Sequence, residues 1–156
     1  MSQNTLRYLK TDPNARYQGY MYFFREGFCW TDVNSTYLKA RIKRNGVFDV
    51  LSMSLFTQIN IPDWYFVCMI NSKLLSFYVD NFINNTSHFQ INDARQLPII
   101  IPSNEQLITC HNLFQEAITL KKEVFNNPTM KSEIEKRVLE IEQILDDFVE
   151  KLYYIV

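Results

Sequence analysis

The C-terminal third of the chain has a pattern of apolar residues that few folds can satisfy. Residues 130–154 place apolar side chains at steps of three and four: Ile134, Val138, Ile141, Leu145, Phe148 and Leu152. This spacing is typical of a helix packed along a seam against another helix. A second helix is predicted from Ser103, which forms a capping box with Gln106, to Asn127-Pro128. The two helices must bury their apolar stripes on each other, on the preceding residues or on another polypeptide.

The preceding residues favour a compact unit of mixed structure. We therefore predict an α+β fold, with a globule at 1–102 and a helical pair at 103–156. Residues 1–20 are expected to be irregular, with a turn at Asp12-Pro13-Asn14. Residues 20–30 predict two strands, or one strand with a bulge. Residues 63–83 predict a largely buried helix, with these residues near helical spacing: Tyr65, Met69, Leu75, Val79 and Phe82.

Residues 88–106 form a short junction between the two parts. Asn92 can cap a helical turn, and residues 99–101 are Ile-Ile-Ile, which predicts a short buried strand. Pro98 and Pro102 limit the length of that strand. We expect this junction to be rigid.

Several classes of function find no support in the sequence. Three glycines are too few for a phosphate-binding loop. No apolar run reaches the length of a membrane span, and the polar N-terminus has no signal-peptide region, so we expect a cytoplasmic protein. Cys29, Cys68 and Cys110 are expected to be reduced and mostly buried, without metal-ligand spacing. His88 and His111 lie in no nucleophile motif. We therefore predict no catalytic residue, metal or cofactor.

Charge is distributed unevenly along the chain. Residues 1–90 carry nine Lys and Arg against six Asp and Glu, whereas residues 91–156 carry seven against eleven. The net charges are +3 and −4, which account for the overall −1. The N-terminal part is therefore the better candidate for contact with a polyanion.

Residues 36–52 give the clearest local signal, a hairpin around Asn45-Gly46. Leu38, Ala40 and Ile42 are expected on one face of its first strand. Lys39, Arg41 and Lys43 are expected on the other face, with Arg44 at the turn. This cationic face fits either a strand edge kept soluble by charge or a strand that contacts phosphates.

The loop at 84–90 is the second candidate binding segment. It offers amide, hydroxyl and imidazole groups suited to base edges. Its predicted DNA contacts are Asn85, Thr86, His88 and Gln90. In the hairpin, Arg44 and Asn45 are predicted DNA contacts together with Lys39, Arg41 and Lys43. An ordinary polar loop has the same composition. Residues 30–34 form a further polar patch, in which Trp30 is more typical of packing than of base contact.

Four motifs in a fixed order resemble a known protein family. They are Glu26-Gly27 with Trp30, Gly46 to Asp49, Asn71-Ser72-Lys73, and the junction from Leu97 to Gln106. Together they resemble the C-terminal target recognition domain of type IIG restriction enzyme–methyltransferases and related adenine-specific DNA methylases. Type I specificity subunits share the junction and helices. The ending at Val149, Leu152 and Tyr153 is similar too, although Tyr154 stands where the family commonly has Gly.

The resemblance covers about residues 20–154 and implies a non-catalytic module of a bacterial type II restriction–modification enzyme. The module would read double-stranded DNA and position a methyltransferase domain or subunit that uses S-adenosylmethionine. The sequence contains neither the N-P-P-[YF] methylation motif nor a nuclease pattern, which implies that catalysis belongs to another domain or polypeptide.

Two other functions compete with this interpretation. The first is a protein-interaction module that docks through its C-terminal helices without touching DNA, which the acidic C-terminal third favours. The second is a small hydrolase whose site carries no familiar motif.

Overall fold

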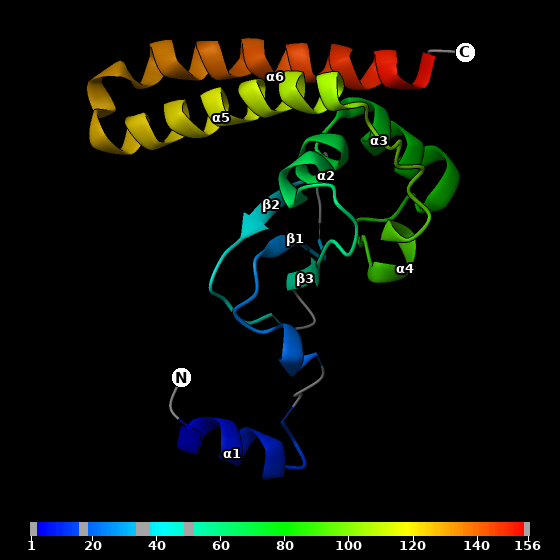
Figure 1. Ribbon diagram of the computed structural model, residues 1–156, viewed down its shortest axis with the longest axis vertical. Coiled ribbons are helices and arrows are strands. Elements are labelled where there is room, and N and C mark those ends of the chain that lie inside the picture. The colour runs from blue at the N-terminus through cyan, green and yellow to red at the C-terminus, as the bar shows by residue number, and fades with distance from the viewer. Residues whose placement is uncertain (1–2, 16–18, 34–37, 49–51, 155–156) are drawn as a thin grey trace.

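The computed structural model describes residues 3–15, 19–33, 38–48 and 52–154 (Figure 1). Its elements, in chain order, are α1 (Gln3–Thr11), η1 (Tyr20–Tyr22), β1 (Gly27–Thr31), β2 (Ala40–Lys43), β3 (Ser52–Leu55), α2 (Asp63–Ile70), α3 (Lys73–Tyr78), the π-helical η2 (Val79–Ile83), α4 (Ile91–Ala94), α5 (Asn104–Asn126), η3 (Pro128–Met130) and α6 (Lys131–Tyr154). The predicted α+β class is confirmed. The helix pair α5–α6 lies across one end of the molecule and α1 lies at the other (Figure 1). Within the described ranges, no helix is long and apolar enough to cross a membrane.

A three-stranded antiparallel sheet has the order β2-β1-β3. Phe28 and Trp30 of β1 point to one face, where α2 packs and where Ala40, paired with Trp30, joins the same core. Gly27 opens β1 because the chain passes close by: a Cβ there would lie 2.5 Å from the carbonyl oxygen of Leu55. This close approach accounts for the glycine at position 27.

The predicted hairpin around Asn45-Gly46 is wrong. The strands on either side of this turn, β2 and β3, both pair with β1 rather than with each other. Asn45 does adopt a left-handed conformation, with φ 48°. After the turn, however, the chain packs the Phe48 ring against Phe23 and Phe56 instead of returning along β2. Ring packing therefore overrides the local hairpin signal.

Two further expectations for the N-terminal part need correction. Residues 3–11, expected to be irregular, form α1, although the turn at 12–15 is present, with Ala15 N–H donating to the Asp12 carbonyl at 3.1 Å. Residues 20–30 contain one strand, β1, preceded by the short 3-10 helix η1 rather than by a second strand.

The helix predicted over 63–83 is interrupted at Asn71-Ser72. The Asn71 amide accepts a hydrogen bond from Ala40 N–H (2.6 Å) and donates one to the Ala40 carbonyl (3.0 Å), so it joins α2 to the backbone of β2. Ser72 then caps α3 by accepting from Leu75 N–H. Polar side chains of these types compete with helical backbone bonds. The predicted buried face is otherwise present, except that Phe82 is exposed.

The junction at 88–106 is held by side chains from distant helices rather than by a strand. Residues 99–101 form no strand, and Ile101 is exposed, so that prediction is wrong. Tyr65 of α2 donates to the Ile100 carbonyl (2.9 Å), and Tyr153 of α6 donates to the Pro98 carbonyl (2.5 Å). The helical turn predicted here is α4, but Gln90 rather than Asn92 precedes it.

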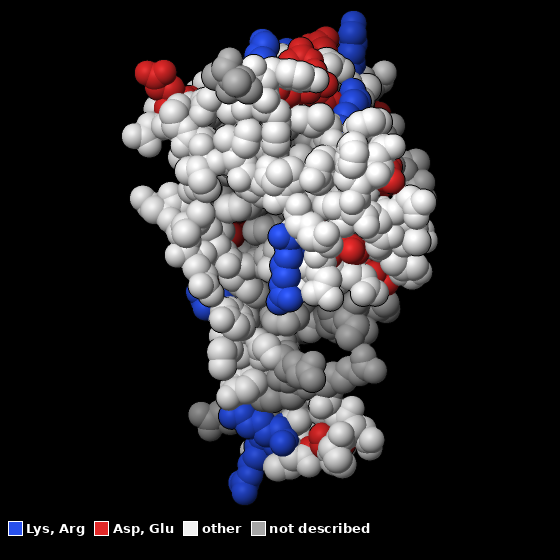
Figure 2. All heavy atoms as spheres, turned by 90° about the vertical axis from the view of Figure 1, so that its right-hand side faces the viewer, with Lys and Arg blue, Asp and Glu red and all other residues white. Residues whose placement is uncertain are grey.

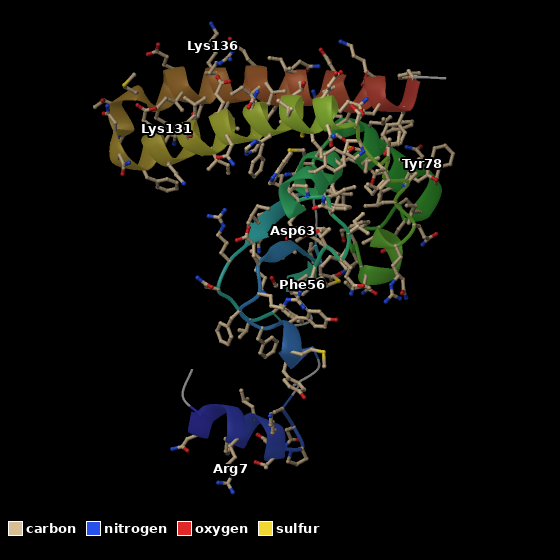
Figure 3. All side chains as sticks on the ribbon, in the orientation of Figure 1. Arg7, Phe56, Asp63, Tyr78, Lys131 and Lys136 are labelled. Atoms are coloured by element: carbon tan, nitrogen blue, oxygen red, sulfur yellow. The ribbon has the colours of Figure 1, made fainter. Side chains whose placement is uncertain are left out.

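The two long helices confirm the seam pattern. Ser103 and Gln106 form the predicted capping box, and η3 breaks the chain after Asn127. The seam residues Ile134, Val138 and Ile141 are buried. Nearer the globule, Val149 and Leu152 of α6 pack with Cys110 of α5 and with residues of α2 and α3. The helix pair is thus anchored at one end, and its other end, near Lys131, extends past the globule (Figure 3).

Candidate nucleic-acid interface

Lys39, just before the edge strand β2, and Arg41, within it, are both exposed. Arg41 pairs with Cys29, so its side chain points away from the sheet face that packs on α2. Two of the three cations predicted to share this face are therefore available to an outside ligand. Cys29, on the same side of the sheet as Arg41, is buried, however. This side of the sheet is therefore covered there, and the cations follow the edge of the sheet rather than an open face.

Lys43, the third predicted cation, is buried, so its assignment to an exposed face is wrong. The residue is 8% exposed, and its Nζ lies over the rings of Phe48 and Phe56, at 4.9 and 5.0 Å from their centroids. Burial lowers the pKa of this ammonium group. The Phe rings offer it cation–π contacts, which make Lys43 part of the packing rather than a phosphate contact.

Arg44 and Asn45 are exposed just beyond β2. Arg44 Nε lies 3.4 Å from Glu26 Oε2, with both side chains largely in solvent. An exposed pair of this kind contributes little, so a phosphate could displace Glu26. Asn45 presents its amide from a left-handed residue at the same end of the strand.

The loop 84–90 is built around the side chain of Asn84. Its amide donates to the His88 carbonyl (2.8 Å) and to Asp93 Oδ2 (3.0 Å), while its oxygen accepts from Thr86 N–H (2.9 Å). These bonds fix the loop backbone. The predicted contact residues in it, Asn85, Thr86, His88 and Gln90, are all exposed.

His88 is oriented by a carboxylate. Its Nδ1 lies 2.7 Å from Oδ2 of Asp32, whose side chain is 13% exposed while that of His88 is 55% exposed. An isolated bridge between Val33 and His88 and a bond from Phe89 N–H to the Asp32 carbonyl (2.8 Å) join the loop to the end of β1. The imidazole Nε2 is consequently the ring nitrogen left for a ligand. The pairing of Asp32 with His88 had no sequence signal, because 56 positions separate the two residues.

Trp30 holds the 84–90 loop from the side of the core. Its indole Nε1 donates to the Phe89 carbonyl (2.8 Å), and its ring is buried beside that of Phe89. The packing role favoured for Trp30 is therefore confirmed.

The predicted contacts form two groups at opposite ends of β2. Lys39 precedes the Ala40–Trp30 pair and so lies at the end of the sheet where β1 runs into Asp32 and the 84–90 loop. Arg44 and Asn45 follow the Lys43–Gly27 pair at the other end. Residues 39 to 44 span about 17 Å at the rise of a strand, which matches about five base pairs of duplex. Arg41 lies between the two groups.

The candidate metal ligands and nucleophiles have the following surroundings. The described residues hold no group of three or more His, Cys, Asp or Glu able to bind a metal ion. His111 stacks on Trp64, with ring centroids 5.0 Å apart. All three cysteines are free and buried, as predicted. A hydrogen bond with Cys110 and burial raise the pKa of the Cys68 thiol, which opposes formation of a nucleophilic thiolate.

No family model matches the chain, and no curated protein matches it.

Proposed function

We propose that this chain is the DNA target recognition module of a restriction–modification enzyme. It would act in the cytoplasm and carry no catalytic site of its own. A methyltransferase domain or subunit, using S-adenosylmethionine, would perform the reaction at the site that this module selects. The observation that carries the proposal is the alignment of Lys39 and Arg41 along an exposed sheet edge that ends at the His88 loop.

The two chemical kinds of predicted contact, cations and amides, would have different tasks. Lys39, Arg41 and Arg44 are suited to phosphates, which fix the register of a protein on DNA without reading its sequence. Asn85 and Gln90 are suited to base edges, because their amides can pair with adenine through two hydrogen bonds. The fixed backbone of the 84–90 loop favours this task, since a reading group must be held in place.

The helix pair would set the distance between this module and the methyltransferase. Tyr65 and Tyr153 tie the junction to α2 and α6, and the far end of the pair extends past the globule (Figure 1). Methylation requires a base turned out of the duplex, so the separation between reading and reacting groups is critical.

Docking of a protein partner through α5 and α6, without DNA contact, is the second candidate. It is favoured by the mixture of acidic and basic side chains over this end of the molecule, visible in Figure 2. Titration of a short fluorescent duplex with the purified chain at increasing salt separates the two functions. A DNA module loses affinity linearly in log salt. Absence of binding at low salt, both alone and with the methyltransferase partner added, would refute the DNA-binding proposal.

A further inference from the structure

Phe24 has a backbone conformation that bulky residues rarely adopt. Its φ is 65°. Among the described residues other than glycine, Asn45 is the only other one with a positive φ. The two segments meet where Phe24 N–H donates to the Gly46 carbonyl at 2.9 Å. Glycine would satisfy this conformation at no steric cost. Strained residues of this kind cluster at ligand contacts, so the side chain of Phe24 requires an explanation.

Phe24 is 45% exposed. Three further large apolar residues near it in the chain, or next to Gly46, are exposed as well: Tyr20, Met21 and Val47. We call these four residues the aromatic tip. The bond from Phe24 N–H to the Gly46 carbonyl places Phe24 beside the turn that carries Arg44 and Asn45.

The residues that precede Phe24 in the chain are held by packed rings. Phe23 meets Phe48 edge-on with ring centroids 5.1 Å apart, and Tyr22 stacks on Phe56 at 5.0 Å. A Cβ at Gly19 would lie 2.9 Å from the Phe48 ring, so the chain packs tightly here as well. The exposed Phe24 therefore follows directly on a segment that is held by packing.

Cations flank the aromatic tip. The Arg25 guanidinium lies over the Tyr22 ring at 5.1 Å, Lys10 Nζ lies over the Tyr20 ring at 5.2 Å, and Arg44 is exposed just before Asn45. An apolar patch beside cations complements a nucleic acid, whose bases stack on aromatic rings while its phosphates meet positive charge.

We propose that Phe24 is a wedge that inserts at a loosened base step of duplex DNA while Arg25 and Arg44 contact the flanking phosphates. Apolar side chains on other DNA-binding proteins enter the stack in this way. The inference rests on the proposed function, because it requires the sheet edge to lie along DNA. It adds a contact that distorts the duplex, in contrast to the phosphate contacts of Lys39 and Arg41.

The test compares binding of the full chain to two short duplexes that differ in one central abasic site. An abasic site has a gap in the stack, so a wedge inserts without separating bases. The wild-type chain should prefer the abasic duplex by about tenfold, because unstacking a base step is costly. Phe24→Gly should abolish this preference, and its urea midpoint should be equal to or higher than that of the wild type, because glycine relieves the strained φ. Phe77→Ala removes another exposed Phe, on α3, and should keep the preference.

The outcomes separate this inference from the proposed function. If the wild-type chain binds both duplexes equally, or if Phe24→Gly keeps the preference, the wedge is refuted while DNA binding stands. That result would assign the aromatic tip to a protein surface instead. If the wild-type chain binds neither duplex, the proposed function and the wedge both fail.

Discussion

Asp146 of α6 holds the start of α3 through two contacts with Lys73. Its Oδ1 accepts from the Lys73 backbone N–H at 2.9 Å, and its Oδ2 lies 3.0 Å from Lys73 Nζ. The first N–H groups of a helix have no partner within that helix. A buried carboxylate from a residue 73 positions away supplies one here, and thereby attaches α6 to the globule.

Substitution of Asp146 should loosen this attachment. Asp146→Ala should lower the free energy of unfolding by about 1–2 kcal/mol, the usual effect of losing a helix-capping acceptor. The Lys73 ammonium is largely exposed, so the ion pair should contribute little. Urea denaturation measures the change. Asp146→Asn, which keeps an acceptor, should lose less, and an equal loss would show that the charge matters more than the cap. Asp147→Ala is the exposed control.

The seam between α5 and α6 gives a second stability prediction. Ile141 is fully buried, and Ile141→Ala should cost about 2–5 kcal/mol because it leaves a cavity. Leu139, two positions earlier, is exposed, so Leu139→Ala should change the free energy of unfolding by less than about 0.5 kcal/mol. Urea denaturation of both variants checks this. Equal costs at the two positions would contradict the register of the helix pair.

The parts of the fold that depend on local signals could be predicted from the sequence. The capping box at Ser103, the break at Asn127-Pro128 and the buried seam of α6 all follow from residues close together in the chain. Contacts between distant residues could not be predicted. The Asn45-Gly46 turn looked like a hairpin because the sequence does not reveal that β1 lies between β2 and β3.

The candidate site shows the same division. Alternation placed Arg41 correctly on the outer side of β2, and Lys39, just before that strand, is exposed as expected. It failed for Lys43 because the rings of Phe48 and Phe56 cover that position. The alternation of side chains along a strand carries no information about either ring contact. The carboxylate partner of His88 was missed for the same reason, because the fold alone brings Asp32 to it.

Alkaline pH should weaken the junction at 88–106. Burial raises the pKa of Tyr153 from 10.0 to about 12, and it also raises the pKa of Tyr65. The folded state therefore holds these protons more tightly than the unfolded state. The resulting stability is fully present below pH 10 and is lost as the pH rises from 10 to 12. Urea denaturation at several pH values should show a decline that is smaller in Tyr153→Phe. An identical decline in the variant would contradict a partly buried Tyr153 that keeps its proton in the folded state.

Removing the buried Lys43 charge should leave DNA affinity unchanged. In Lys43→Met an apolar chain of similar length stays between the rings. The free energy of unfolding should not fall, because burial already disfavours the ammonium form. Fluorescence anisotropy with a short duplex should give the same salt slope as the wild type. A slope smaller by about one would mean that Lys43 does reach a phosphate.

The salt dependence of duplex binding by Lys39→Ala/Arg41→Ala tests the central claim most directly. Both residues are exposed on the outer edge of the sheet, so the substitutions should leave the urea midpoint unchanged. If each cation neutralises one phosphate, the slope of log affinity against log salt should be smaller by about two than in the wild type. The control is Lys131→Ala/Lys136→Ala, which removes two exposed cations from α6. Full affinity and an unchanged slope in the sheet-edge variant would show that Lys39 and Arg41 serve solubility alone, and would contradict the proposed DNA interface.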